Sequence, residues 1–213
     1  LRSCVKNLNV NHIITSVIEH HAVTHTVEDL EKSSKIKISY VKIDKFGEID
    51  YDDLEKLLKD NTDYNSLVSL MHINNEIGNI TDISKVSKIC KKYNSLFHTD
   101  TVQSVGHYKL DFKELDVDFF VASAHKFHGP KGIGFTFVKK DSSLGEFITG
   151  GMQEKGIRAG TESVHNIVGM SKALELAYEN LDIERQKILE LKTYFIDQII
   201  TLFPEVKFNG MCN

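Results

Sequence analysis

The sequence predicts an α/β fold in which a mostly parallel central sheet is flanked by helices. Short β-branched runs alternate with stretches of helical spacing, and polar residues gather directly after the predicted strands. Strands separated by helices pair in parallel, because right-handed crossovers return the chain to the same end of the sheet. The 213 residues are 41% hydrophobic and 26% charged, which is typical of a globular chain with a sizeable core.

The predicted elements follow one another in a regular order. Residues 12–16 form a short β-branched run, and Val23, Val27 and Leu30 then recur at helical spacing. The same alternation predicts strands at residues 36–41, 67–71, 96–99, 119–122 and 133–138, and helices at residues 50–59, 82–93, 162–178 and 183–202. Residues 206–208 have the pattern of the first strand of a further unit.

Composition argues against several classes of partner. The 26 basic and 30 acidic residues give a net charge of -4 without long runs of one sign, so we expect no direct nucleic-acid partner. No apolar stretch approaches the ~18 residues that cross a membrane, and we expect no membrane partner. Cys4, Cys90 and Cys212 form no CxxC pair, which favours a reducing compartment. We therefore expect a cytoplasmic protein, although a chain that begins at Leu1 leaves a transit peptide and an organelle such as the mitochondrion open.

Lys126 is the predicted catalytic residue. It lies in the segment SAHKFHGPKG, directly after the predicted strand at residues 119–122. A neutral lysine at a strand end, near cationic or apolar groups, can condense with an aldehyde. A solvated surface lysine is the plain alternative, but Ser123 and His125 before it and a Gly-Pro turn behind it favour a functional lysine.

Asp100 follows the predicted strand at residues 96–99. A carboxylate at this place can pair with a protonated pyridine nitrogen, and that charge makes a cofactor ring an electron sink. Gln103, about one helical turn later, can donate to a phenolic oxygen of the same ring. Capping of the next helix is an equally good explanation of Asp100.

Two further strand ends carry polar side chains. Asn75 lies in HINNEIG, where asparagines before a glycine often form only a turn. A ligand contact becomes credible because several strands deliver polar groups to the same edge. In EHHAV the ring of one histidine, His20 or His21, can stack on a planar cofactor, although histidine is also ordinary at a helix start.

Metal and nucleotide sites are weaker interpretations. The pairs His21/His25 and His125/His128 have spacings that suit two zinc ligands, but no HExxH motif and no nearby cysteine accompany them, so we expect no metal site. The segment GGMQEKGIRAGT is not a P-loop, because Ile-Arg stands where Lys-Ser/Thr is needed. Thr161 can still meet a phosphate at the start of the next helix.

Together these segments resemble a known family. EHHAV, MHINNEIG, HTDTVQSVG, SAHKFHGPKGIG and GIRAGTESVHNIVG, in this order and spacing, are similar to the NifS/IscS-type cysteine desulfurases within the class V aminotransferase-like group. The resemblance implies the large domain of a fold-type I enzyme that uses pyridoxal 5'-phosphate (PLP) and works as a homodimer. It implies conversion of L-cysteine to L-alanine with an enzyme-bound persulfide, which supplies sulfur for iron-sulfur clusters or thiolation through a scaffold or other sulfur-acceptor protein.

Carried over by motif, the resemblance also implies roles for single residues. Lys126 and His20 would be the catalytic residues: Lys126 forms an imine with the cofactor aldehyde and then moves protons, and His20 stacks on the ring. Asp100 would pair with the pyridine nitrogen. Gln103 and Asn75 would contact the phenolic oxygen or the substrate. Ser123 and His125 would bind the phosphate, and Thr161 would contact the phosphate of the partner subunit's cofactor.

The chain also departs from the family pattern. None of its three cysteines lies in a motif like that of the persulfide-forming cysteine, and the substrate-binding arginine of the family has no counterpart here. We therefore expect a fragment, incomplete at both ends and inactive alone. Residues 1–180 would be part of the PLP-binding large domain, and residues 181–213 a connecting helix and the start of a C-terminal small domain. A selenocysteine lyase, an aminotransferase or a non-catalytic truncated PLP-fold chain is the alternative.

Overall fold

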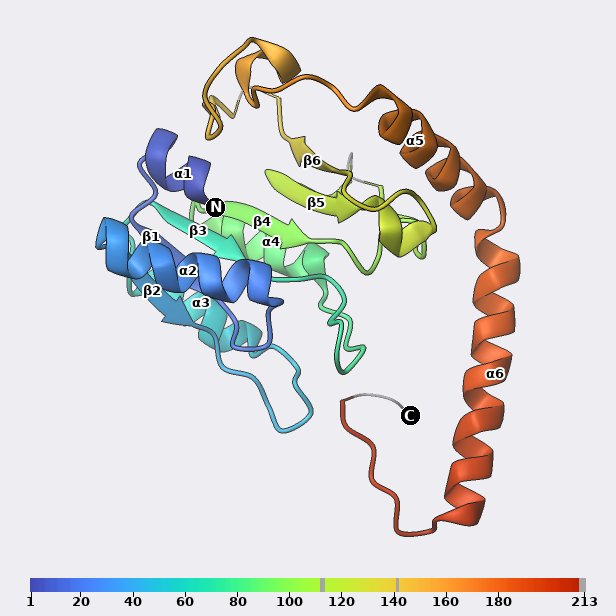
Figure 1. Cartoon of the computed structure of the whole chain (residues 1–213). Coiled ribbons are helices and arrows are strands. Elements are labelled where there is room, and N and C mark those ends of the chain that lie inside the picture. Colours follow the sequence, from blue (N-terminus) through green and yellow to red (C-terminus); the bar gives the residue numbers. More distant parts are fainter. Residues whose placement is uncertain (112–113, 141, 211–213) are drawn as a thin grey trace.

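The computed structural model describes residues 1–111, 114–140 and 142–210, and its centre is a six-stranded sheet in the order β2-β1-β3-β4-β5-β6 (Figure 1). The strands are β1 (His12–Thr15), β2 (Lys37–Tyr40), β3 (Ser66–Ser69), β4 (Leu96–Asp100), β5 (Phe119–Ser123) and β6 (Gly134–Val138). All pairs from β2 to β5 are parallel, and β6 runs antiparallel to β5. The predicted mostly parallel sheet is confirmed.

Within the described residues, six α-helices and two short 3-10 helices accompany these strands. They are α1 (Arg2–Asn7), α2 (His21–Ser34), α3 (Tyr51–Lys59), α4 (Ile83–Lys92), α5 (Val164–Glu179), α6 (Leu181–Leu202), η1 (Ala124–Phe127) and η2 (Gln153–Gly156). Aspartate caps start two of them: the Asp50 carboxylate accepts from two backbone N–H groups of α3, and Asp82 accepts from one in α4. The helices predicted from periodicity are confirmed, and where bounds were predicted their ends differ by at most two residues.

Two details of the sequence prediction need correction. The helix α1 was not predicted, because its six residues are too few to show a helical period. The strand expected at residues 206–208 is wrong: this segment follows α6 as irregular chain. A short extended segment is stable as a strand only when another strand pairs with it, and residues 206–208 appear in no strand pairing of the described chain.

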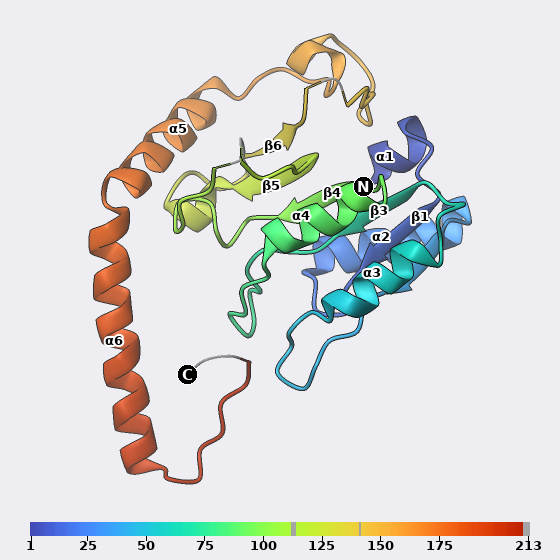
Figure 2. The same cartoon turned by 180° about the vertical axis from the view of Figure 1, so that it is seen from behind.

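Alternation along the strands builds a core on each face of the sheet. Ile13 and Leu67 point to the face covered by α1 and α2, whereas Ile14 and Val68 point to the face covered by α3 and α4. Figure 1 shows α2 in front of the sheet, and Figure 2, from behind, shows α3 and α4 in front. The central strands β1, β3 and β4 are therefore buried on both faces, and ligands can reach them only at their ends.

The two C-terminal helices differ from the rest of the molecule. The helix α5 packs through Ala177 against Phe127 and Val105 in a small third core cluster. The helix α6 extends away from the sheet (Figures 1 and 2), and large apolar side chains along it are exposed. In the described part of the chain, no helix is long and apolar enough to span a membrane.

Candidate active site

The carboxyl ends of four neighbouring strands surround one cavity of about 220 Å³. Because parallel strands all point the same way, the loops that follow β1, β3, β4 and β5 meet at one edge of the sheet. Every predicted site residue except Thr161 lines this cavity. The lining residues are His20, Met71, Asn75, Asp100, Val102, Gln103, Ser123, His125 and Lys126.

The tight turn after β5 presents Lys126. The strand passes directly into η1, and the N–H of Gly129 closes the turn on the carbonyl oxygen of Ala124 over 2.8 Å. Phe127 is 1% exposed and anchors the turn in the core, whereas Lys126 is exposed and faces the cavity. The backbone is thus fixed by a buried neighbour while the amine stays accessible.

Asp100 is the last residue of β4, and its side chain is 7% exposed. Its Oδ1 accepts from the N–H of Val102 over 2.9 Å. Burial raises the pKa of Asp100 above its ordinary value, while the Val102 N–H and the nearby His20 act in the opposite direction. Asp100 caps a turn at residues 102–107 and not the helix weighed in the sequence analysis, and it also lines the cavity.

His20 is placed by the start of α2. It is the N-cap residue, and its Nδ1 accepts from the N–H of Ala22 over 3.1 Å, so a neutral ring carries its proton on Nε2. His21 does not line the cavity, and its ring packs 4.7 Å from that of His25, centroid to centroid. Of the two adjacent histidines, the structure brings His20 to the cavity.

The two asparagines after β3 do different things. Asn74 is buried: its Oδ1 accepts from the N–H groups of Glu76 and Ile77, and its Nδ2 donates to the carbonyl oxygen of Ile18. These bonds build the turn. Asn75 is exposed and lines the cavity, so the turn and the ligand contact weighed for this segment fall on adjacent residues.

Ser123 and His125 form a hydrogen-bonded pair on the cavity wall. The Ser123 Oγ lies 2.8 Å from the His125 Nδ1. When Ser123 donates to that nitrogen, a neutral ring keeps its proton on Nε2, so the pair offers the Nε2–H of His125 as a hydrogen-bond donor to an anion. In the His125/His128 pair, which was weighed above as two zinc ligands, the Nδ1 of His125 is therefore already hydrogen-bonded to Ser123.

The set of groups around the cavity can be compared with known proteins. The family Aminotransferase class-V matches residues 5–212.

The chain belongs to the class-V aminotransferase family.

Several curated relatives of the chain are cysteine desulfurases. The cysteine desulfurase IscS of Dictyoglomus turgidum is 47% identical over 93% of this chain and 50% of its own length. A solved NifS-like protein has a TM-score of 0.88 and 37% identity over 94% of this chain and 55% of its own. A solved structure of SspA in complex with cysteine has a TM-score of 0.74 and 32% identity over 82% of this chain and 51% of its own. The chain spans about half the length of the curated relatives it matches.

The donor set of this class-V chain fits PLP, the cofactor on which the family depends. A primary amine (Lys126) suits its aldehyde, and a buried carboxylate (Asp100) suits its ring nitrogen. An imidazole (His20) suits its planar face, and a hydroxyl with a second imidazole (Ser123, His125) suits its phosphate. The cavity has room for one substituted aromatic ring.

Thr161 does not line the cavity. It is exposed and follows the segment of η2, where Arg158 bonds the carbonyl oxygen of Gly160 and the carboxylate of Glu162. The sequence prediction assigned Thr161 to the cofactor of a partner subunit.

Three residues at or behind the cavity were not predicted to belong to the site. Met71 and Val102 line the cavity, and their apolar side chains give no signal that separates them from core residues. Glu19 lies behind them: its Oε1 accepts from the Ser16 Oγ over 2.8 Å and from the N–H of Met71 over 3.1 Å. Burial raises the pKa of Glu19 to about 8, and the charge of Asp100 adds to the effect. Its place beside His20 in EHHAV was the available signal.

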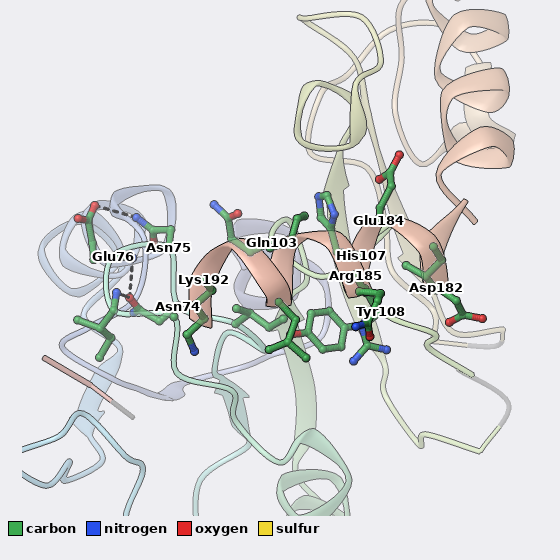
Figure 3. A pocket seen from close by; sticks show the side chains of 18 residues that line it. Asn74, Asn75, Glu76, Gln103, His107, Tyr108, Asp182, Glu184, Arg185 and Lys192 are labelled. Atoms are coloured by element: carbon green, nitrogen blue, oxygen red, sulfur yellow. Dashed lines mark hydrogen bonds between the residues drawn. The ribbon is translucent and has the colours of Figure 1, made fainter. Parts of the chain in front are cut away.

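A larger hollow of about 940 Å³ adjoins the cavity at the strand ends, and Asn75 and Gln103 line both. Figure 3 shows it between the loop that carries Asn75 and the residues of α6, which include Arg185. The guanidinium of Arg185 lies 4.8 Å from the centre of the Tyr108 ring.

Proposed function

We propose that this chain supplies the cofactor-binding part of a PLP-dependent cysteine desulfurase, which converts L-cysteine to L-alanine and transfers the sulfur to a thiol. The observation that carries the proposal is that the amine of Lys126 and the buried carboxylate of Asp100 line the same cavity. The similarity to cysteine desulfurases named IscS, and to a structure solved with cysteine, supports the choice of substrate.

When bound, PLP supplies an electron sink for the bonds around the substrate's α-carbon. Lys126 would hold the cofactor through its Nζ and would move a proton at the substrate's α-carbon. Asp100 would hold a proton at the ring nitrogen. His20 would contact the ring, and Gln103 and Asn75, which line the same cavity, would orient the phenolic oxygen or the substrate.

Ser123 and His125 bind the phosphate in this proposal. Their mutual hydrogen bond of 2.8 Å fixes both side chains before the anion arrives. With Ser123 and His125 holding the phosphate and Lys126 the aldehyde, these residues would together fix the orientation of the ring. Asp100, which lines the same cavity, would be the partner for the ring nitrogen.

Sulfur leaves the substrate as a nucleophilic thiolate takes it up, so the reaction needs an accessible cysteine of low pKa. Cys4 and Cys90 are buried, and burial raises the pKa of both thiols. Neither has the chemistry of a persulfide-forming residue. Cys212 lies outside the described residues. We propose that a thiol of the whole protein outside this chain takes the sulfur.

The remaining predictions concern the whole protein. We propose that it is a homodimer in which Thr161 contacts the phosphate of the partner subunit's cofactor, and that an iron-sulfur scaffold or another acceptor takes its sulfur. We propose a cytoplasmic location, with an organelle such as the mitochondrion as the alternative. The break between α5 and α6 at Asn180 supports a division into residues 1–180 and residues 181–213.

The decisive experiment is to add PLP to the 213-residue chain, reduce it with borohydride and locate the adduct by peptide mass spectrometry. A primary amine that condenses with the aldehyde becomes permanently labelled. We expect the label on Lys126 and none on Lys131, an exposed lysine five residues further along that does not line the cavity. Labelling spread evenly over exposed lysines would refute the proposal.

A second experiment tests the need for an outside thiol. The chain loaded with PLP is incubated with L-cysteine, and alanine and sulfide are measured. We expect no repeated turnover, because the described cysteines are buried. Sustained production of both products would overturn our account of the sulfur acceptor while leaving the role of Lys126 intact.

A further inference from the structure

One hydrogen bond joins the segment after β4 to the backbone of Lys126. The Nε2 of His107 lies 2.8 Å from the backbone carbonyl oxygen of Lys126. A carbonyl oxygen only accepts, so Nε2 carries a proton and donates. His107 belongs to the same segment as Asp100 and Gln103, and this contact therefore connects the two sides of the cavity.

The segment that presents His107 is itself firmly held. The N–H and the Oγ1 of Thr101 both donate to the carbonyl oxygen of Val121 in β5, over 3.2 Å and 2.7 Å. The N–H of Val105 then donates to the carbonyl oxygen of Thr101, and that of His107 to Ser104, each over 3.0 Å. These successive turns fix the backbone of His107 relative to the sheet.

Close packing beside His107 fixes its distance from Lys126. Gly106 has a φ of +83°, and a Cβ at this position would lie 2.6 Å from the Cβ of Phe127. Only glycine permits this approach without a shift of the chain. Phe127 is buried with Val105 and Ala177 in one apolar cluster, so the two segments are pressed together next to the hydrogen bond.

Lys126 needs such support because of where it lies. It is in a 3-10 helix of four residues, a type of helix with weak internal hydrogen bonds. Its side chain is exposed and has many rotamers, each of which must be given up when the amine reacts. A backbone held in advance lowers that cost, since the direction of the Cα–Cβ bond is already set.

We propose that His107 is a positioning residue, whose ring holds the Lys126 carbonyl and so sets the direction in which the lysine enters the cavity. The inference rests on the proposed function for the role of Lys126. His107 lines the larger hollow and not the smaller cavity, so it acts through Lys126 and touches no cofactor held there (Figure 3).

The test uses His107→Phe, which removes the donor but keeps a ring, and His107→Gln, which keeps an N–H donor. His165→Phe, at an exposed histidine of α5, is the matched control. The first measurement is amide hydrogen exchange of residues 126–129 in the chain without PLP. We expect exchange about five- to tenfold faster in His107→Phe, near the wild-type rate in His107→Gln, and no change in the control.

The second measurement is the initial rate of borohydride-trapped PLP labelling at Lys126. We expect it to fall about fivefold in His107→Phe, as the loss of one hydrogen bond predicts, and to recover only in part in His107→Gln, whose amide donor lacks the ring. Circular dichroism checks each fold. If His107→Phe does not fold, the partial loss in His107→Gln relative to wild type carries the test, and an unchanged rate in that variant would contradict the positioning role.

The outcomes separate the inference from the proposed function. Unchanged exchange in His107→Phe overturns the contact, and faster exchange with an unchanged labelling rate overturns its positioning role. A wild-type chain that is not labelled at Lys126 refutes the proposed function, and the positioning role falls with it. The exchange data would then still show whether the His107 contact itself exists.

Discussion

The strand-end cavity and the helix α6 differ in how their apolar residues are covered. The elements that carry the polar side chains of the cavity are anchored by buried rings: Phe97 in β4 is 0% exposed, and Phe127 in η1 is 1% exposed. On α6, Leu189 is 56% exposed and Phe195 is 60% exposed. A helix without a packed apolar face is stabilised by little more than its own hydrogen bonds, so the site region should be rigid and α6 should open readily.

The largest expected difference between the two regions is chemical. Lys126→Ala should abolish the borohydride-trapped PLP label, because the cavity then lacks its only lysine among the lining residues. Lys187→Ala, an exposed lysine on α6, should leave the label unchanged. Peptide mass spectrometry measures both, and persistent labelling in Lys126→Ala would remove the distinction between the regions.

The same contrast should appear in stability. Phe97→Ala removes a fully buried ring from the core and should lower the free energy of unfolding by about 3–5 kcal/mol. Phe195→Ala removes an exposed ring from α6 and should change it by less than about 0.5 kcal/mol. Urea denaturation followed by circular dichroism checks both values. Equal losses would mean that α6 is packed in solution.

The pH dependence of stability should come from groups buried in the sheet region. Burial lowers the pKa of His12 and His72 to about 4 and of His98 to about 3, from an ordinary 6.5. The unfolded chain therefore binds more protons than the native chain between pH 4 and 6.5, and stability rises with pH in this window.

Glu19 has the opposite effect. Its pKa is raised from 4.5 to about 8, so the native chain binds the extra proton between these values and stability falls as pH rises. Above pH 6.5 the histidines no longer contribute, and we expect a maximum of stability near that pH. Thermal unfolding across pH 4 to 8 measures it. Glu19→Gln should abolish the decline on the alkaline side, and a decline that persists would place its cause elsewhere.

The smallest expected effect is a change in PLP affinity that leaves the labelling of Lys126 in place. Asp100→Asn keeps an oxygen for the Val102 N–H but loses the charge beside the cofactor ring. We expect Lys126 to be labelled still, with PLP affinity lower by about tenfold, the scale of one charge-assisted hydrogen bond. Titration with PLP measures the change, and Asp60→Asn at an exposed helix end is the control. Unaltered affinity would argue against a partnership with the ring nitrogen.

Much of the site followed from the sequence because strand ends in a parallel sheet share an edge. Asn75, Asp100 and Lys126 were predicted to meet from their places after separate strands, and they line one cavity. The contact of His107 with Lys126 was not predictable in this way, since it spans 19 positions and depends on the approach of Gly106 to Phe127. Such packing leaves no periodic pattern in the sequence.

The sequence by itself determined the order of strands and helices, the parallel sheet and the polar residues at its carboxyl end, because local spacing decides which residues share a face. Only the tertiary structure decided which of His20 and His21 reaches the cavity, which asparagine builds the turn, and that Glu19 is buried. These choices depend on burial and on hydrogen bonds between distant segments, and both come into being only when the chain is packed.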